Sequence, residues 1–146
     1  MRMRALFTLL IPFAFTACGS DSSTGTVSIE QTNFAASLNV NLAASTKTAD
    51  GLYYRDITVG TGATIVAGSD LNVKYSGALT DGTVFDAGTY SFRIPGGVIQ
   101  GWNEGLLGMK VGGTRQLIIP PALAYGSQGA GQIPPNAVLV FTVQPI

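Results

Sequence analysis

The sequence predicts an α+β domain in which an antiparallel β-sheet wraps around one short α-helix. Three observations carry this prediction. From residue 50 onward, short segments rich in aromatic and β-branched residues are separated by glycine and proline, as in strands joined by tight turns. The dipeptide Asp81-Gly82 is typical of a hairpin between two antiparallel strands. One stretch in the middle of this region, residues 98–107, spaces its apolar residues like one face of a helix.

Six segments have the composition of short strands. Residues 71–75 alternate apolar and polar side chains, which is the pattern of a strand with one buried face. Asp81-Gly82 favours a type I′ turn, in which both central residues need positive φ, so residues 83–85 are expected to return as the partner strand. The predicted strands are residues 52–58, 71–75, 83–85, 90–94, 115–119 and 138–143.

The predicted helix lies between the fourth and fifth of these segments. Proline and glycine at residues 95–97 precede it, and Gly112 and Gly113 end the unit after it. Because a single amphipathic helix must bury its apolar face, we expect the sheet to cover it. The residues on this face are Val98, Ile99, Trp102, Leu106 and Leu107.

The first 17 residues are expected to be a secretory signal peptide. Arg2 and Arg4 give a basic start, and residues 5–15 form an almost uninterrupted apolar run. This run is too short to span a bilayer as a permanent helix. The predicted organisation is a signal peptide at 1–17, a lipid-attachment cysteine with a linker or arm at 18–49, and a compact domain at 50–146.

Cys18 follows the apolar run and is the single cysteine of the chain. With Thr16 and Ala17 it resembles a bacterial lipobox, whose cysteine receives a diacylglyceryl group, although Phe15 stands where leucine is usual. The resemblance implies an exported lipoprotein in the periplasm or at the cell surface, attached to the membrane by its lipid anchor. Gly19 favours the outer membrane. The alternative is a plain signal peptide with a cysteine there by chance.

A polar segment connects the cysteine to the domain. Residues 19–26 are small and polar without an apolar period, which indicates a flexible linker. In residues 27–48 the apolar side chains Leu38, Val40 and Leu42 alternate with asparagines. This alternation fits a short edge strand, and it fits equally an arm packed on the domain.

Composition excludes several classes of function. The chain of 146 residues has no histidine and one cysteine, which excludes a Ser-His-Asp triad, an imidazole metal site, a zinc finger and an internal disulfide. Eight basic and eight acidic residues balance, so no electrostatic footprint for nucleic acid is expected. The sequence lacks the glycine-rich loop ending in Lys-Ser or Lys-Thr that binds nucleotide phosphates. We therefore expect no metal and no cofactor, and a site made of carboxylates, hydroxyls, aromatic surfaces or the backbone.

Five motifs occur in order along the predicted domain: 73–77 (VKYSG), 81–86 (DGTVFD), 98–102 (VIQGW), 119–126 (IPPALAYG) and 133–141 (IPPNAVLVF). Together they resemble the FKBP-type peptidyl-prolyl cis-trans isomerases, the macrolide-binding class, over residues 50–146. The resemblance implies an enzyme that rotates X-Pro bonds in a hydrophobic pocket without a cofactor and assists the folding of exported proteins. It also implies proline-containing polypeptides as partners and macrolides as inhibitors.

The resemblance implies roles for particular residues. Trp102 resembles the indole that forms the floor under the prolyl ring, and Tyr125 resembles the phenol that hydrogen-bonds the ligand. Asp86 resembles the carboxylate that faces the pocket, while Tyr75, Phe85 and Phe141 resemble its aromatic walls. The implied catalytic set is therefore Tyr75, Phe85, Asp86, Trp102, Tyr125 and Phe141.

A second group is implied to bind the substrate. Val98 and Ile99 resemble the aliphatic rim, and the backbone amide of Ile99 corresponds to the one that donates to a ligand carbonyl. Ile133 resembles a residue that lines the pocket from the late loop. Tyr90 aligns with a phenylalanine beside the pocket, with Phe92 turned to the core.

Two segments depart from the family pattern. Residues 85–98 are shorter than in the best-known members and lack the arginine that often pairs with the pocket carboxylate. The loop at 125–134, which shapes substrate preference in the family, is also slightly short, so specificity does not transfer. Two alternative functions therefore remain open. One is a module that binds proline-containing segments with little turnover, and the other is a chaperone whose holding activity lies on another surface.

Overall fold

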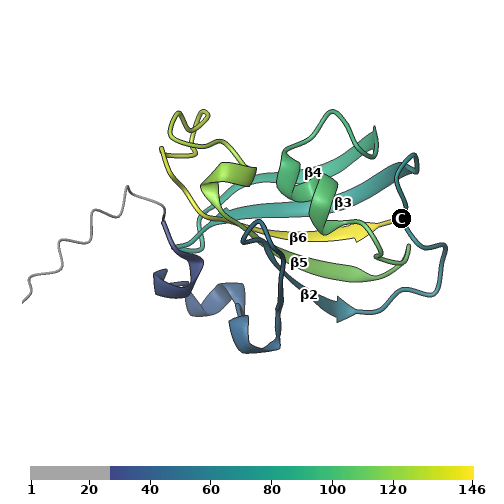
Figure 1. Cartoon of the computed structure of the whole chain (residues 1–146), viewed down its shortest axis with the longest axis horizontal. Helices are drawn as coiled ribbons and strands as arrows, with labels where there is room; N and C mark the ends of the chain where they lie inside the picture. The colour runs from purple at the N-terminus through teal and green to yellow at the C-terminus, as the bar shows by residue number, and fades with distance from the viewer. Residues whose placement is uncertain (1–26) are drawn as a thin grey trace, which may run out of the picture.

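A six-stranded antiparallel sheet forms the body of the computed structural model, which describes residues 27–146 (Figure 1). The spatial order of the strands is β1-β2-β5-β6-β3-β4. The predicted signal peptide and Cys18 lie outside the described residues, among which no helix is long and apolar enough to cross a membrane. The strands are β1 (Thr46–Lys47), β2 (Tyr53–Thr58), β3 (Asp70–Leu79), β4 (Val84–Arg93), β5 (Thr114–Ile119) and β6 (Leu139–Pro145).

The predicted strands are confirmed with one difference in their division, and the structure adds β1, which was not predicted. Residues 83–85 and 90–94 are expected as two strands, but the structure joins them in the single ten-residue strand β4. Gly88 lies between the two segments and does not break the strand, because its backbone stays in register opposite Tyr75 of β3. The prediction of a break was wrong, and β4 is one long edge of the sheet.

The turn between β3 and β4 is not the predicted type I′ turn. Gly82 has a φ of +91°, whereas Asp81 is not in the positive range. The Gly82 N–H donates to the Leu79 carbonyl at 3.0 Å, which closes a four-residue turn whose last residue is the left-handed glycine. This is the pattern of a three-residue hairpin loop. The Asp81 carboxylate stabilises it by accepting the Thr83 N–H at 2.8 Å.

Helix α1 (Gln100–Gly105) lies against β5 and is shorter than the predicted stretch. Two glycines allow a close approach. A Cβ at Gly101 would lie 2.5 Å from Ile119 Cγ2, and one at Gly105 would lie 2.7 Å from Leu117 Cδ2. Larger residues at either position would push the helix off the sheet. The main core fills the space between α1 and the sheet, and its fully buried members include Leu52, Val73, Leu106, Leu117, Ile119, Leu139 and Val143.

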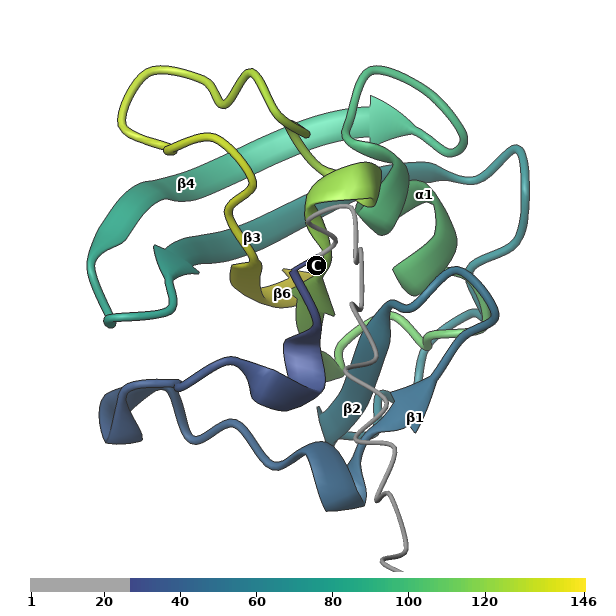
Figure 2. The ribbon, with the colours of Figure 1, turned by 60° about the vertical axis from the view of Figure 1, so that its left-hand side comes forward.

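The arm, residues 27–48, covers the other face of the sheet (Figure 2). Because side chains alternate along a strand, Ile118 and Val140 face the arm while their chain neighbours face α1. Residues 38–42 are not an edge strand, so of the two open alternatives the packed arm is correct. The arm consists of the 3₁₀ turns η1 (Ile29–Gln31), η2 (Ala36–Leu38) and η3 (Leu42–Ala44), followed by β1.

Polar contacts fix the arm to the sheet at several points. The Gln116 side chain donates to the Leu38 carbonyl at 2.7 Å. Glu30 accepts from the Tyr53 hydroxyl at 2.5 Å and forms an ion pair with Lys47 of β1. The apolar contacts join Ile29, Phe34, Leu38, Val40 and Leu42 of the arm to Tyr53, Ile118, Val138 and Val140 of the domain.

We expect the contacts of Glu30 to make the stability of the fold depend on pH. Hydrogen bonds from Lys47, then Ser28 and Tyr53, hold the pKa of Glu30 well below its usual range. A carboxylate with a lowered folded pKa stabilises the fold above its unfolded pKa of about 4.3, and this contribution is lost as the pH falls through the folded value. The difference in unfolding free energy between the wild type and Glu30→Gln, measured by urea unfolding, should be largest near neutral pH and should shrink progressively as the pH falls below about 4. A difference that persists undiminished into acid would contradict this assignment.

Candidate functional site

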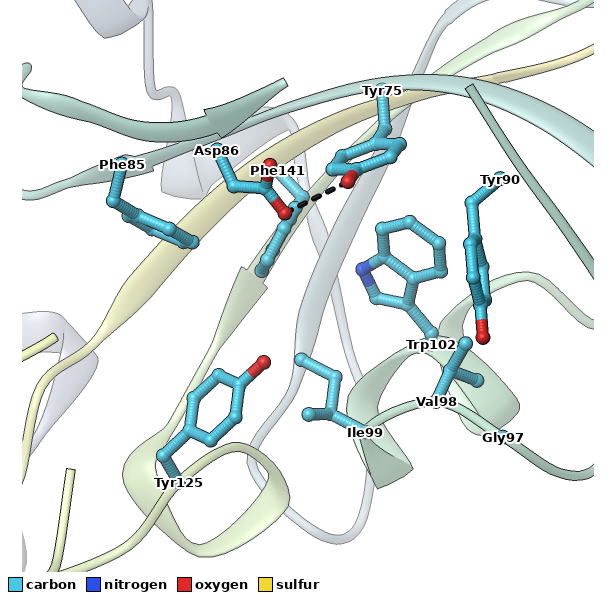
Figure 3. A pocket seen from close by; sticks show the side chains of 10 residues that line it. All are labelled: Tyr75, Phe85, Asp86, Tyr90, Gly97, Val98, Ile99, Trp102, Tyr125 and Phe141. Atoms are coloured by element: carbon cyan, nitrogen blue, oxygen red, sulfur yellow. Dashed lines mark hydrogen bonds between the residues drawn. The ribbon is translucent and has the colours of Figure 1, made fainter. Parts of the chain in front are cut away.

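A cavity of about 200 Å³ opens on the α1 side of the sheet (Figure 3). It combines an apolar floor with polar groups on its walls, as small-ligand sites do. The structure brings together all but one of the pocket residues predicted from the sequence and adds Gly97. The lining residues are Tyr75, Phe85, Asp86, Tyr90, Gly97, Val98, Ile99, Trp102, Tyr125 and Phe141.

The floor of the cavity is an aromatic cluster around Trp102, whose side chain is 4% exposed. The Trp102 ring packs edge-on with Tyr75, with centroids 5.2 Å apart, and with Phe141, with centroids 5.4 Å apart. Phe85 continues the wall with an edge-on contact to Phe141 at 5.6 Å. Such edge-to-face pairs have a preferred geometry, so each ring limits the movement of the next.

An irregularity in the β3–β4 pairing places two neighbouring residues on the cavity wall. Gly77 pairs with Asp86 and Ala78 pairs with Val84, so Phe85 is an extra residue on β4. In a regular strand, Phe85 and Asp86 would point to opposite faces. A bulge redirects one of them. Both side chains therefore line the cavity, which the DGTVFD motif alone does not reveal.

Gly77 leaves the space that two of the aromatic walls fill. A Cβ at this position would lie 2.5 Å from Phe141 Cε1 and 2.8 Å from Phe85 Cζ. We expect Gly77→Ala to displace these rings, to destabilise the fold by about 1–3 kcal/mol, and to weaken ligand binding in the cavity. Denaturant unfolding and titration with a macrolide would measure the two effects. Unchanged values for both would show that the rings move aside freely.

The carboxylate of Asp86 is held by Tyr75 across the cavity wall. The Tyr75 hydroxyl donates to Asp86 Oδ2 at 2.8 Å. This hydrogen bond, together with partial burial, raises the pKa of Tyr75 to about 12. The phenol therefore keeps its proton at physiological pH and remains a donor. In this chain Tyr75 occupies one oxygen of the carboxylate for which the family pattern often supplies an arginine.

Two further donors are available to a ligand. Tyr125 follows the 3₁₀ turn η4 (Pro121–Leu123) on the loop opposite β4, and Figure 3 shows its hydroxyl directed into the cavity. Its side chain is 39% exposed, so a ligand reaches it without rearrangement of the core. The Ile99 N–H lies at the start of α1 and has no acceptor among residues 27–146. Figure 3 shows the side chains of Tyr125 and Ile99 across the cavity from Asp86.

Ile133 is the predicted pocket residue that the structure places elsewhere. It is 7% exposed and belongs to the main core rather than the cavity wall. The Ala130 and Ile133 backbones exchange hydrogen bonds of 3.0 and 2.8 Å, which closes a tight loop. Gly97, which sequence reasoning missed, contributes backbone beside Tyr90. Within residues 27–146 no cluster of three His, Cys, Asp or Glu side chains forms a metal site.

Comparisons with known proteins agree with this geometry. The sequence profile of the FKBP-type peptidyl-prolyl cis-trans isomerase family matches residues 62–145. FK506-binding protein 4 of Chaetomium thermophilum is 45% identical over 103 residues, which are 67% of this chain and 21% of that protein. The chain spans only 21–28% of the length of this protein and of its counterparts in Dictyostelium discoideum, Gibberella zeae and Rhizopus delemar.

Solved structures show the same relationship. The crystal structure of AtFKBP13 is 39% identical, with a TM-score of 0.65, over 70% of this chain and 96% of its own. The crystal structure of FkpA from Escherichia coli is 41% identical, with a TM-score of 0.66, over 70% of this chain and 50% of its own. Because the family profile covers more than half of the 146 residues, the chain belongs to the FKBP-type peptidyl-prolyl cis-trans isomerase family.

Proposed function

We propose that this chain catalyses cis-trans isomerisation of X-Pro bonds in exported polypeptides. The observation that carries the proposal is the Trp102-floored cavity, with Asp86 on one wall and the donors Tyr125 and Ile99 N–H on the other. Family membership and the site geometry support the proposal. It needs no cofactor, since the reaction breaks no covalent bond.

The energetics of the X-Pro bond explain why such a cavity is suited to the reaction. Rotation has a barrier of about 18–20 kcal/mol, because amide resonance is lost in the twisted state. The twisted amide is less dipolar than the planar one, so an apolar enclosure disfavours the planar ground state relative to the twisted state. The floor of Trp102 and Phe141 supplies that enclosure. Tyr125 and the Ile99 N–H hold the neighbouring carbonyls, which keeps the prolyl ring on the floor.

A protease-coupled assay on a short X-Pro peptide tests the proposal. We expect acceleration above the slow uncatalysed rate. Tyr125→Phe should lower kcat/KM by about twofold to tenfold, the usual value of one neutral hydrogen bond. Tyr53→Phe is the matched control, because it removes a phenol hydroxyl from the opposite face of the sheet. The assignment would be overturned if both variants lost activity, or if the wild-type protein did not accelerate isomerisation.

We further propose that a lipid on Cys18 holds the domain at a membrane surface outside the cytoplasm, with the outer membrane favoured. The support is the sequence of residues 1–19, with its basic start, apolar run and single cysteine. More than one acyl chain is needed for stable anchoring. Mass spectrometry of the membrane-extracted protein should show acylation at Cys18, and Cys18→Ala should release the protein into the soluble fraction. An unmodified Cys18 would refute the anchor.

Binding with little turnover is a second candidate, which one observation favours. Ile133 lies in the core, so the late loop leaves the cavity without one aliphatic contact that the family resemblance implies. Macrolide binding by a folded protein that does not accelerate isomerisation would support this candidate over the enzyme.

A further inference from the structure

Strand β4 is a long, exposed edge of the sheet. It is last in the strand order, and eight of its ten residues are exposed. Long edge strands are commonly protected by proline, charged side chains, a bulge or a covering segment. The bulge of β4 lies at Phe85, near the start of the strand, so residues 87–92 remain a regular edge. The β4 sequence VFDAGTYSFR contains neither proline nor lysine, and no backbone hydrogen bond joins residues 85–92 to a segment other than β3 among the described residues.

The register of β3 and β4 identifies which backbone groups face outward. In an antiparallel pair, successive residues alternate between bonding the partner strand and pointing away from it. The Ile94 N–H donates to the Ser69 carbonyl at 3.0 Å, so Ile94 points toward the β3 side. Counting back along β4 in twos, the backbone of Gly88 also points toward β3. The N–H and C=O groups of Ala87, Thr89 and Ser91 therefore point to the open edge.

Gly88 leaves a gap in the side chains of β4 beside the cavity. By strand alternation it shares a face with Asp86 and Tyr90, both of which line the cavity. Its φ is not positive, and a Cβ built at this position would meet nothing within 4 Å. Neither backbone conformation nor packing requires glycine here. A glycine inside a strand often marks the close approach of another backbone.

We propose that the open edge of β4 binds an extended polypeptide substrate as an added antiparallel or parallel strand, with the substrate chain passing over Gly88 between the edge and the cavity. This inference rests on the proposed function and defines the substrate as an extended chain rather than a proline residue alone. The outward groups of Thr89 and Ser91 pair with residues that flank the proline. Sequence selectivity is low, because backbone groups do most of the binding.

Continuity with the cavity favours a substrate over a second copy of the protein as the occupant. Phe85, Asp86 and Tyr90 belong to the same strand and line the cavity. A chain with its proline on Trp102 must leave the cavity past one of the surrounding elements. Gly88 itself presents no side chain to a chain that crosses β4 there, whereas Asp86 and Tyr90, its neighbours on the same face of the strand, do. The other edge, β1, has two residues and lies at the opposite end of the sheet.

Amide hydrogen exchange of the whole protein provides the direct test. The probe is a reduced, carboxymethylated polypeptide of about 100 residues that contains proline and remains unfolded. On its addition we expect the Thr89 and Ser91 amides to exchange at least about tenfold more slowly, as amides do when they enter a sheet. A proline tetrapeptide should not produce this protection. If the Thr89 and Ser91 amides stayed unprotected while the long polypeptide was bound, the proposal would be overturned. It would also be overturned if these amides became protected without substrate, and more so at higher protein concentration, because the occupant of the edge would then be a second copy of the protein.

Gly88→Val provides the second arm, because valine fills the gap and favours the strand. We expect the fold to be at least as stable as the wild type, while the ratio of kcat/KM for the long polypeptide to that for the tetrapeptide falls roughly tenfold, or about 1.4 kcal/mol. Ser76→Val on the outer face of β3 is the control and should keep the wild-type ratio. An unchanged ratio in Gly88→Val would refute the path over Gly88. If the amides were protected but the protein did not catalyse isomerisation, the proposed enzymatic function would be refuted, whereas binding of an extended chain at β4 would be supported.

Discussion

Trp102→Ala should abolish measurable isomerase activity and macrolide binding and should destabilise the fold by about 3–5 kcal/mol. The indole is 4% exposed and contacts Tyr75, Phe92 and Phe141, so its removal opens a void in the floor of the cavity. The rings around it lose the edge contacts that orient them. The substrate then meets a wider and wetter site, in which the planar amide is no longer disfavoured.

Trp102→Leu separates the catalytic effect from the loss of stability. Leucine fills part of the void and should restore much of the unfolding free energy, but it supplies no flat surface for a prolyl ring. We expect a cooperative urea transition together with kcat/KM at least about tenfold below the wild type, since several contacts to the ring are lost. If Trp102→Leu isomerised peptides at the wild-type rate, the floor would serve packing alone.

Arg115→Ala is expected to be the most damaging change outside the cavity. The guanidinium donates to both oxygens of Asp56, at 2.6 and 2.9 Å, and to the carbonyl of Gly105 at 2.8 Å. It also lies 4.6 Å from the centroid of the Tyr54 ring. Arg115 thus joins β5 to β2 and to the C-terminal end of α1. The Arg115 side chain is 5% exposed but that of Asp56 is 35% exposed, so removal of the guanidinium leaves the carboxylate in contact with water. The cost, about 2–4 kcal/mol, comes mainly from the lost buried hydrogen bonds and packing of the guanidinium.

Thermal unfolding measures this effect. A loss of about 2–4 kcal/mol corresponds to a fall in Tm of about 8–16 °C for a domain of this size. Arg115→Lys keeps the charge but cannot form the planar fork to a carboxylate, so it should recover only part of the loss. Because Arg115 holds the C-terminal end of α1, the Trp102 fluorescence of Arg115→Ala should change at a lower temperature than the global unfolding transition. A Tm within a few degrees of the wild type for Arg115→Ala would contradict the role assigned here.

Much of the fold and site follows from local features of the sequence. Alternation at 71–75 and the aromatic and branched composition of 52–58 and 115–119 predict strands that the structure confirms. The pocket residues Tyr75, Trp102 and others lie in short motifs whose order is typical of one family. That order places them around one cavity even though they come from different strands and the helix.

Other features depend on long-range contacts that no local pattern reveals. Leu38, Val40 and Leu42 alternate with polar residues as in a strand, but they pack as part of an irregular arm on the apolar face of the sheet opposite α1. Phe85 reaches the cavity because β4 is one residue out of register with β3. Ile133 packs in the main core, in a loop closed by its backbone hydrogen bonds with Ala130. Each outcome is decided by a partner distant in sequence or by loop geometry.

The proposed mechanism requires that the cavity floored by Trp102 lowers the barrier to rotation about an X-Pro bond. NMR exchange spectroscopy on a proline peptide at equilibrium measures this rotation without a coupling protease. Catalytic amounts of the protein should produce exchange peaks between the cis and trans forms, and an excess of macrolide or the substitution Trp102→Leu should remove them. Absence of exchange peaks with folded wild-type protein, or their persistence when the cavity is filled by macrolide, would show that the cavity does not catalyse the rotation.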